Sequence, residues 1–176
     1  MPPLAGAAGI SVEAMRQAIL EFRGVPHRLE IIAEQAGVTW VNDSIATAPE
    51  RVVAALQSFS EPLILLAGGR DKDLPWAELV GVAVERCKVV ITFGEFGPEI
   101  ARLLNYAQRG KLSGQLQRIE QVATLDEAVQ LAQRATVAGD VVLLSPGGTS
   151  FDAYRDFAER GEHFRSLVAR LHNQSD

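Results

Sequence analysis

The stretch Leu63-Ile64-Leu65-Leu66-Ala67-Gly68-Gly69 decides the fold class of this chain. An unbroken apolar run followed by two glycines predicts a strand buried on both faces, with a loop at its carboxyl end. The same pattern returns at 88–93 and at 141–144, each run again followed by a glycine-containing loop. Strands buried on both faces belong to parallel sheets that are covered by helices, so the pattern predicts an α/β protein.

The segments between these strands have the periodicity of helices. We predict helices over 48–56, 76–87, 98–106, 124–138 and 152–171, and a weak strand over 116–119. Thr47 is the expected N-cap of the first helix, which has Pro49 and Glu50 in its first turn. Thr124 and Glu127 have the spacing of a capping box. Alternating strands and helices predict one Rossmann-like α/β domain, with a mainly parallel sheet and helices on both faces.

An additional helix and a β-hairpin are expected before this alternation begins. Residues 1–9 read as a tail, and Ser11 is a plausible N-cap for a helix over 10–22. Over 28–41 the apolar residues Leu29, Ile31 and Ala33 alternate with their neighbours, and 35–37 reads as a tight turn. We therefore expect an N-terminal hairpin added to the domain.

Composition excludes several classes of protein. The chain has 176 residues, a net charge of −5, a single cysteine (Cys87) and three histidines. One cysteine excludes an internal disulfide framework and a cysteine-built zinc site, and Cys87 itself reads as a core residue. The acidic balance gives no support to a nucleic-acid partner, and no apolar run is long enough to span a membrane. We expect a soluble, cytoplasmic protein with no membrane partner.

Ligands of open α/β sheets bind beyond the carboxyl ends of the strands, and the loops there are polar or rich in glycine. They are 42–47, 68–73, 94–97 and 145–150. The last one precedes a helix, where backbone amides suit a carboxylate or a phosphate, although a plain connector would read the same way. No GxxxxGK[ST] or GxGxxG motif is present.

Single residues in these loops allow two interpretations each. Lys72 is a point charge for an anion or part of a solvated turn with Asp71 and Asp73. Arg28 holds a carboxylate or pairs with Glu30 or Glu34. Residues 42–44 and Thr47 read more readily as capping residues than as ligands, and His163 reads as an exposed helix residue.

Taken in order, six segments carry a family resemblance. They are Gly24-Val25-Pro26-His27-Arg28-Leu29-Glu30, Trp40-Val41-Asn42-Asp43-Ser44-Ile45-Ala46-Thr47, Ala67-Gly68-Gly69-Arg70-Asp71-Lys72, Phe93-Gly94, Leu144-Ser145-Pro146-Gly147-Gly148-Thr149-Ser150-Phe151-Asp152, and 157–161. Together they resemble the C-terminal domain of the Mur ligases, and within that family the enzymes that add D-glutamate. The resemblance implies a tail and linker helix over 1–23 and the amino-acid-binding domain over 24–176.

The resemblance also implies an activity and roles for residues. Full-length members use ATP and Mg²⁺, held mostly by a central domain, to couple D-glutamate to UDP-N-acetylmuramoyl-L-alanine through an acyl phosphate in peptidoglycan synthesis. No catalytic residue and no metal ligand falls in this chain. Arg28, Asn42 and Asp43 match residues that hold the adenine nucleotide. The residues that match positions around D-glutamate are Thr47, Lys72, Ser150, Phe151 and Phe157.

Two positions depart from the common pattern of these enzymes. Ile45 stands where a lysine follows Asn-Asp-Ser, so one cationic contact is absent, and Gly147-Gly148 lies within a loop that more often reads Ser-Pro-Ala-Cys-Ala-Ser. Two alternatives stay open: a related ligase that adds another amino acid, and a free-standing binding module without catalysis. The Asp-Asn-Pro-Arg signature of ligases that add diaminopimelate or lysine is absent.

Overall fold

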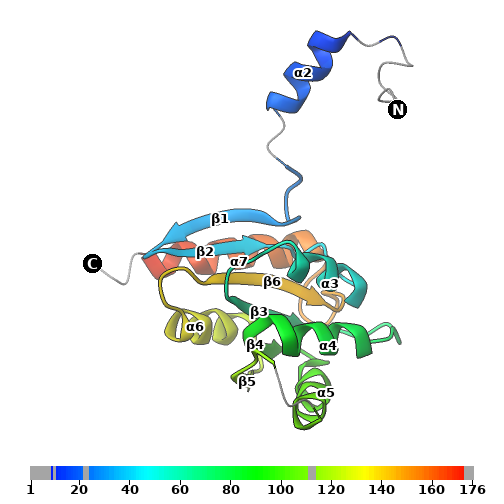
Figure 1. The fold of residues 1–176 in the computed structure, drawn as a ribbon, viewed down its shortest axis with the longest axis vertical. Coiled ribbons are helices and arrows are strands. Elements are labelled where there is room, and N and C mark those ends of the chain that lie inside the picture. Colours follow the sequence, from blue (N-terminus) through cyan, green and yellow to red (C-terminus); the bar gives the residue numbers. More distant parts are fainter. Residues whose placement is uncertain (1–8, 10, 22–23, 111–113, 173–176) are drawn as a thin grey trace.

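Six strands form one sheet in the order β1-β2-β6-β3-β4-β5, shown in Figure 1. The structure, a computed structural model, describes residues 9, 11–21, 24–110 and 114–172. Its strands are β1 (Glu30–Gln35), β2 (Val38–Asn42), β3 (Leu63–Gly68), β4 (Cys87–Phe93), β5 (Arg118–Gln121) and β6 (Val141–Gly147). The helices are α2 (Val12–Glu21), α3 (Pro49–Gln57), α4 (Ala77–Arg86), α5 (Gly97–Arg109), α6 (Leu125–Ala135) and α7 (Phe157–His172). The predicted fold class is confirmed.

The predicted hairpin is part of this sheet rather than an addition to it. β1 and β2 are antiparallel, and β2 continues into the sheet by pairing with β6 in parallel. All the pairs from β2 to β5 are parallel. The turn falls at Ala36 and Gly37, whose φ values of 51° and 75° match the two central residues of a type I′ turn.

The simple alternation expected along β1 is wrong. A β-bulge lies between Ile31 and Ala33, so that Ile31 is 59% exposed while Ile32 and Ala33 pack against the core. A bulge adds one residue to one strand and shifts the side chains beyond it to the other face. A strict period of two could not anticipate this shift.

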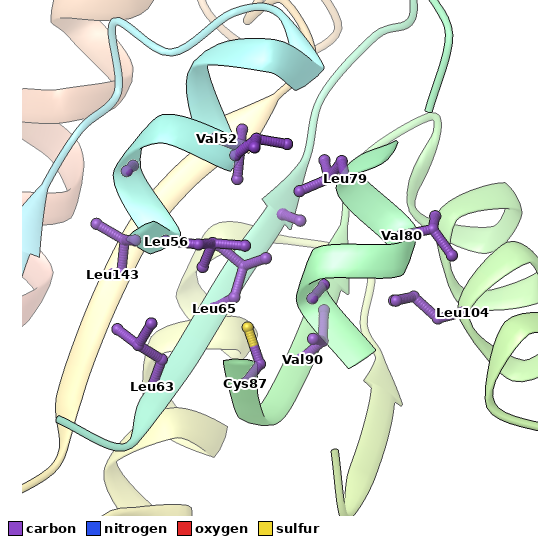
Figure 2. Packing of buried hydrophobic residues seen from close by; sticks show 14 of the residues in the cluster. Val52, Leu56, Leu63, Leu65, Leu79, Val80, Cys87, Val90, Leu104 and Leu143 are labelled. Carbon is purple, nitrogen blue, oxygen red and sulfur yellow. The ribbon is translucent and has the colours of Figure 1, made fainter. Parts of the chain in front are cut away.

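Two hydrophobic cores lie on the two faces of the sheet. Helices α3, α4 and α5 cover one face, where Val52, Leu79 and Leu104 pack against Leu65 and Leu143 (Figure 2). Helices α6 and α7 cover the other face. Strand β3 serves both cores, because Leu63, Leu65 and Ala67 face one and Ile64 and Leu66 face the other. This arrangement explains its unbroken apolar sequence.

Several helix ends were predicted correctly. Ser11 Oγ accepts a 3.2 Å hydrogen bond from the amide of Ala14 before α2. Thr124 and Glu127 form the predicted capping box of α6. Pro49 and Glu50 lie in the first turn of α3, but the N-cap of this helix is Ala48, with no side-chain hydrogen bond, so the cap expected at Thr47 is wrong.

Other helix ends differ from the prediction. Cys87 begins β4 instead of ending α4, although it is buried as expected. Helix α7 begins at Phe157 rather than at 152, because Asp156 Oδ1 accepts a 2.8 Å hydrogen bond from the Glu159 amide. Glu159 also accepts from the amide of Arg155 at 2.7 Å, so this end resembles a capping box. The consequence is a turn-containing segment over 151–156 that carries Phe151. Among the described residues, no helix has the length and apolar character needed to cross a membrane.

Candidate functional site

Three of the predicted ligand loops meet at one edge of the sheet. β6 lies between β2 and β3, and the register aligns Asn42 with Leu144 and Gly68 with Gly147. The loops after these three strands therefore leave the sheet side by side. This is the position at which open α/β sheets bind their ligands.

Glycines allow the loops after β3 and β6 to touch through their backbones. Gly69 has a φ of +94°, and a Cβ atom there would lie 2.2 Å from the carbonyl oxygen of Thr149. A Cβ atom on Gly148 would lie 2.6 Å from the carbonyl oxygen of Gly68. Arg70 and Thr149 exchange backbone hydrogen bonds of 2.9 and 2.8 Å. The two loops are thus fixed relative to each other.

Asp43 is a buried carboxylate in the loop after β2, and it does not cap a helix. Its Oδ2 accepts a 2.7 Å hydrogen bond from Ser145 Oγ, and its Oδ1 accepts a 3.2 Å bond from the amide of Leu29. Burial raises the pKa of Asp43 above its ordinary value, although these hydrogen bonds and the charges of Arg28 and Arg51 oppose the shift. A fixed carboxylate of this kind can accept hydrogen bonds from the hydroxyl groups of a ligand.

Asn42 joins the start of the domain to the last helix. Its Nδ2 lies 3.0 Å from His27 Nδ1 and donates a 3.3 Å hydrogen bond to the carbonyl oxygen of Gly161. Its Oδ1 accepts a 3.2 Å bond from the amide of Ser44. Asn42 is fully buried, and its side chain links the residues on either side of it in the fold. The interpretation of 42–44 as helix caps is therefore wrong.

Arg160 of α7 is buried beneath these loops. Its guanidinium donates to Ser44 Oγ at 3.0 Å, to Ser44 O at 2.9 Å and to Gly148 O at 3.2 Å. Desolvation lowers its pKa to about 10, which leaves it charged at neutral pH. Arg160 thus connects the loop after β2 to the loop after β6. Sequence reasoning missed it, because an arginine in an amphipathic helix gives no sign of burial.

Arg28 borders a cavity that Asp43 also lines. The cavity has a volume of about 220 Å³ and is lined by Arg28, Leu29, Asp43, Ile45, Ala46, Arg51, Ala54, Ala55 and Ser58. The pairing considered for Arg28 with Glu30 is not formed, since Glu30 instead accepts from Arg165 at 2.9 Å and from the His27 amide. Arg28 and Asp43 therefore share one cavity, whereas Asn42 does not line it.

The residues expected around the amino acid lie in the same set of loops. Thr47 is half-buried at the end of the loop after β2, and Ser150 is buried just beyond β6. Phe151 is 61% exposed, which leaves its ring free to contact a ligand. Phe157 is half-buried at the start of α7, with its ring 6.1 Å from that of His27 in an edge-to-face arrangement.

Lys72 is exposed in the loop after β3. Its neighbour Asp71 is not simply solvated, because the indole of Trp76 donates to Asp71 Oδ1 at 2.9 Å. Partial burial raises the pKa of Asp71, but this bond and bonds from nearby backbone amides lower it by more. The net shift of the pKa is therefore downward. Trp76 in turn lies against Gly147, where a Cβ atom would be 2.9 Å from the ring. Asp71 therefore anchors the loop and leaves Lys72 pointing away from the core.

His163 was expected to be an exposed helix residue, but it is half-buried and has two partners. Its Nδ1 lies 2.9 Å from Tyr154 Oη, and its Nε2 lies 3.5 Å from Asp126 Oδ2. Burial raises the pKa of Tyr154 to about 12. This contact ties the 151–156 segment to α6 and α7.

Comparisons with known proteins identify the family of the chain. A family described as "Mur ligase, glutamate ligase domain" matches residues 27–148, and the chain belongs to this family. The chain is 43% identical over 164 residues to UDP-N-acetylmuramoylalanine--D-glutamate ligase of Symbiobacterium thermophilum. It is 39% identical over 156 residues to the protein of the same name from Acetivibrio thermocellus. These matches cover 93% and 89% of the chain but only 35% and 34% of the relatives.

The chain thus spans about a third of the length of the curated relatives it matches. Solved structures with the same fold include Mycobacterium tuberculosis folylpolyglutamate synthase complexed with ADP, with a TM-score of 0.65 and 14% identity. A second is UDP-N-acetylmuramoyl-L-alanyl-D-glutamate--2,6-diaminopimelate ligase, with a TM-score of 0.57 and 19% identity. They cover 93% and 96% of this chain, which covers 37% of each of them. At these identities they support the fold alone.

Proposed function

We propose that this chain is the amino-acid-binding domain of an ATP-dependent ligase that adds D-glutamate to UDP-N-acetylmuramoyl-L-alanine. The observation that carries the proposal is the junction of the loops after β2 and β6, where Ser145 holds the buried carboxylate of Asp43. Its support is the sequence identity to D-glutamate ligases over nearly the whole chain. Residues 1–23 would be the tail and linker to a preceding domain, and residues 24–176 the domain itself.

In this proposal the chain's residues bind and orient the substrates, and the reaction takes place between the bound substrate molecules. ATP transfers its γ-phosphoryl group to the carboxylate of the UDP-linked substrate, and ADP leaves. The amine of D-glutamate then attacks the acyl phosphate, inorganic phosphate leaves and an amide bond forms. Mg²⁺ would assist the phosphoryl transfer, with its ligands on the preceding domain. Within the described residues, no three potential metal ligands lie together.

Two groups of residues would divide the work. Arg28 and Asp43, with Asn42 beside them, would hold the adenine nucleotide. Lys72 would neutralise one carboxylate of D-glutamate, since an exposed lysine is a compact point charge. The hydroxyl groups of Thr47 and Ser150 would bind the carboxylates, with Phe151 and Phe157 packing over the amino acid. The setting would be cytoplasmic peptidoglycan synthesis, and through it cell-wall growth and division.

Ligation by a fusion protein tests the proposal. The chain would be joined to the part of the Symbiobacterium relative that precedes the matching segment, and phosphate release would be measured with ATP and UDP-N-acetylmuramoyl-L-alanine. We expect release to depend on D-glutamate and not on L-glutamate, L-lysine or meso-diaminopimelate. Activity with another amino acid would instead support a related ligase, and a fusion that binds ligands without turnover would support a binding module.

The chain alone provides a matched control. We expect it to release no phosphate from ATP, because the phosphate-binding motif is absent from its sequence. We also expect ATP to bind more weakly than about 1 μM, which corresponds to about −8 kcal/mol. Calorimetric binding tighter than this would contradict a nucleotide site shared between domains.

A further inference from the structure

The cavity beside Asp43 holds more positive charge than the sequence pattern indicated. It lies between the loop at 28–29, the loop at 43–46 and the side of α3 from Arg51 to the C-cap residue Ser58. Two arginines line it, Arg28 from the loop before β1 and Arg51 from α3. Both are exposed, and both lower the pKa of Asp43 against the effect of burial.

Neither guanidinium forms an ion pair within the described part of the chain. No carboxylate there lies within 4.0 Å of Arg28 or Arg51, in contrast to Arg165, which pairs with Glu30 at 2.9 Å. Asp43 forms no ion pair with either arginine, although its charge interacts favourably with both, and its two oxygens accept from Leu29 and Ser145. The cavity therefore presents two cations and one fixed hydrogen-bond acceptor.

The position of Arg51 in α3 works against the stability of the helix. The helix begins at Pro49, so Arg51 lies in its first turn. The amino end of a helix carries a partial positive charge, and a cation there is unfavourable. Local helix physics therefore gives no reason for this arginine, whereas an anion in the cavity would be attracted by its charge.

Arg51 also enters the cavity that Ile45 borders. The sequence resemblance implies a lysine at position 45, and its absence removes one cation from the site. Arg51, six residues further along the chain and on a different element, places a positive charge in the same cavity.

We propose that Arg51 is a nucleotide-binding residue that contacts the phosphates of the adenine nucleotide together with Arg28. This rests on the proposed function, to which it adds a residue outside the six segments that carry the family resemblance. The cavity fits a nucleotide better than a dicarboxylate, because a nucleotide has ribose hydroxyls to donate to Asp43 and phosphates to accept from the arginines. A second carboxylate beside Asp43 would be repelled.

Titration of the chain with ADP and with adenosine tests this role. Binding would be followed through the backbone amide signals of Asp43 and Ile45, for wild type, Arg51→Ala, Arg51→Lys and Arg134→Ala. Arg134 is an exposed arginine on α6, which covers the opposite face of the sheet. The Arg134→Ala variant therefore controls for the loss of one positive charge.

We expect Arg51→Ala to weaken ADP binding about fivefold, the effect of one exposed charge pair, and to leave adenosine binding unchanged. Arg51→Lys should retain part of the ADP affinity, Arg134→Ala all of it, and the difference should shrink in high salt. The proposal is overturned if Arg51→Ala binds ADP as wild type does, if it loses adenosine equally, or if ADP shifts neither amide in the wild type. Because D-glutamate is not present in this titration, its outcome is independent of the amino-acid specificity tested with the fusion.

Discussion

Ser145 Oγ donates a 2.7 Å hydrogen bond to the carboxylate of Asp43, although 102 residues separate the two in the sequence. The bond joins the end of β6 to the loop after β2, which are neighbours in the sheet. A serine hydroxyl that donates to a buried carboxylate favours its ionised form. The pair therefore favours a negative charge in the cavity that Arg28 and Arg51 line, although burial of that charge is unfavourable.

We expect Asp43→Asn to abolish ADP binding without destabilising the chain. Burial raises the pKa of Asp43 in the folded state above its ordinary value of 3.8. The folded chain thus binds this proton more tightly than the unfolded chain does, so the contribution of Asp43 to stability is present below about pH 4 and is lost as the pH rises through the folded-state pKa. At pH 7 the neutral asparagine should leave the free energy of unfolding equal to wild type or higher by about 1 kcal/mol.

Urea unfolding of both proteins between pH 3 and pH 7 measures this difference. Wild type and Asp43→Asn should have similar stability at the acid end and diverge above it. A variant that is much less stable than wild type at pH 7 would mean that the ionised carboxylate stabilises the fold.

Removal of the Ser145 hydroxyl should have two consequences. Ser145→Ala leaves Asp43 Oδ2 buried without its donor, which should lower the free energy of unfolding by about 1–2 kcal/mol. It should also raise the pKa of Asp43 further, because the hydroxyl opposes the effect of burial. Carboxyl NMR titration and urea unfolding give the two values. Ser166→Ala is the control, since Ser166 is exposed and donates only to the carbonyl oxygen of Glu162. An equal loss of stability in Ser166→Ala would mean that the bond from Ser145 to Asp43 has no special role.

A matched pair of glycine variants tests the contact between the loops after β3 and β6. Gly69→Ala places a methyl group against the Thr149 carbonyl in a backbone conformation with a φ of +94°, so we expect a loss of about 2 kcal/mol or more in stability. Gly81→Ala lies within α4, where a Cβ atom meets nothing within 4 Å, and should raise stability by about 0.5–1 kcal/mol. Thermal unfolding of the two variants measures both effects, and a tolerated Gly69→Ala would mean that the loops can separate.

The sequence predicted the sheet and the loops of the site well, because local patterns determine them. The run from Leu63 to Ala67 must be buried on both faces, and a glycine-rich loop must follow it. Arg160 and His27 were not identified, because their burial depends on contacts with Ser44, Gly148 and Asn42 that no local pattern encodes. The start of α7 at Phe157 could have been predicted from the sequence, because Asp156 and Glu159 have the spacing of an N-cap residue and its partner.

The two described lysines should give opposite results when each is replaced by alanine. Lys88 lies 2.8 Å from the buried carboxylate of Asp140, so Lys88→Ala should lower the free energy of unfolding by about 2 kcal/mol, less than for a fully buried pair. Lys72 is exposed and forms no ion pair within the described residues, so Lys72→Ala should change stability by no more than about 0.5 kcal/mol. In the fusion enzyme, Lys72→Ala should instead reduce D-glutamate-dependent turnover about tenfold or more, because a charge-assisted contact to a carboxylate is lost. A Lys72→Ala protein that retains turnover but melts well below wild type would show that Lys72 supports the fold, with Asp71 or Asp73 as its partner, and would remove it from the substrate site.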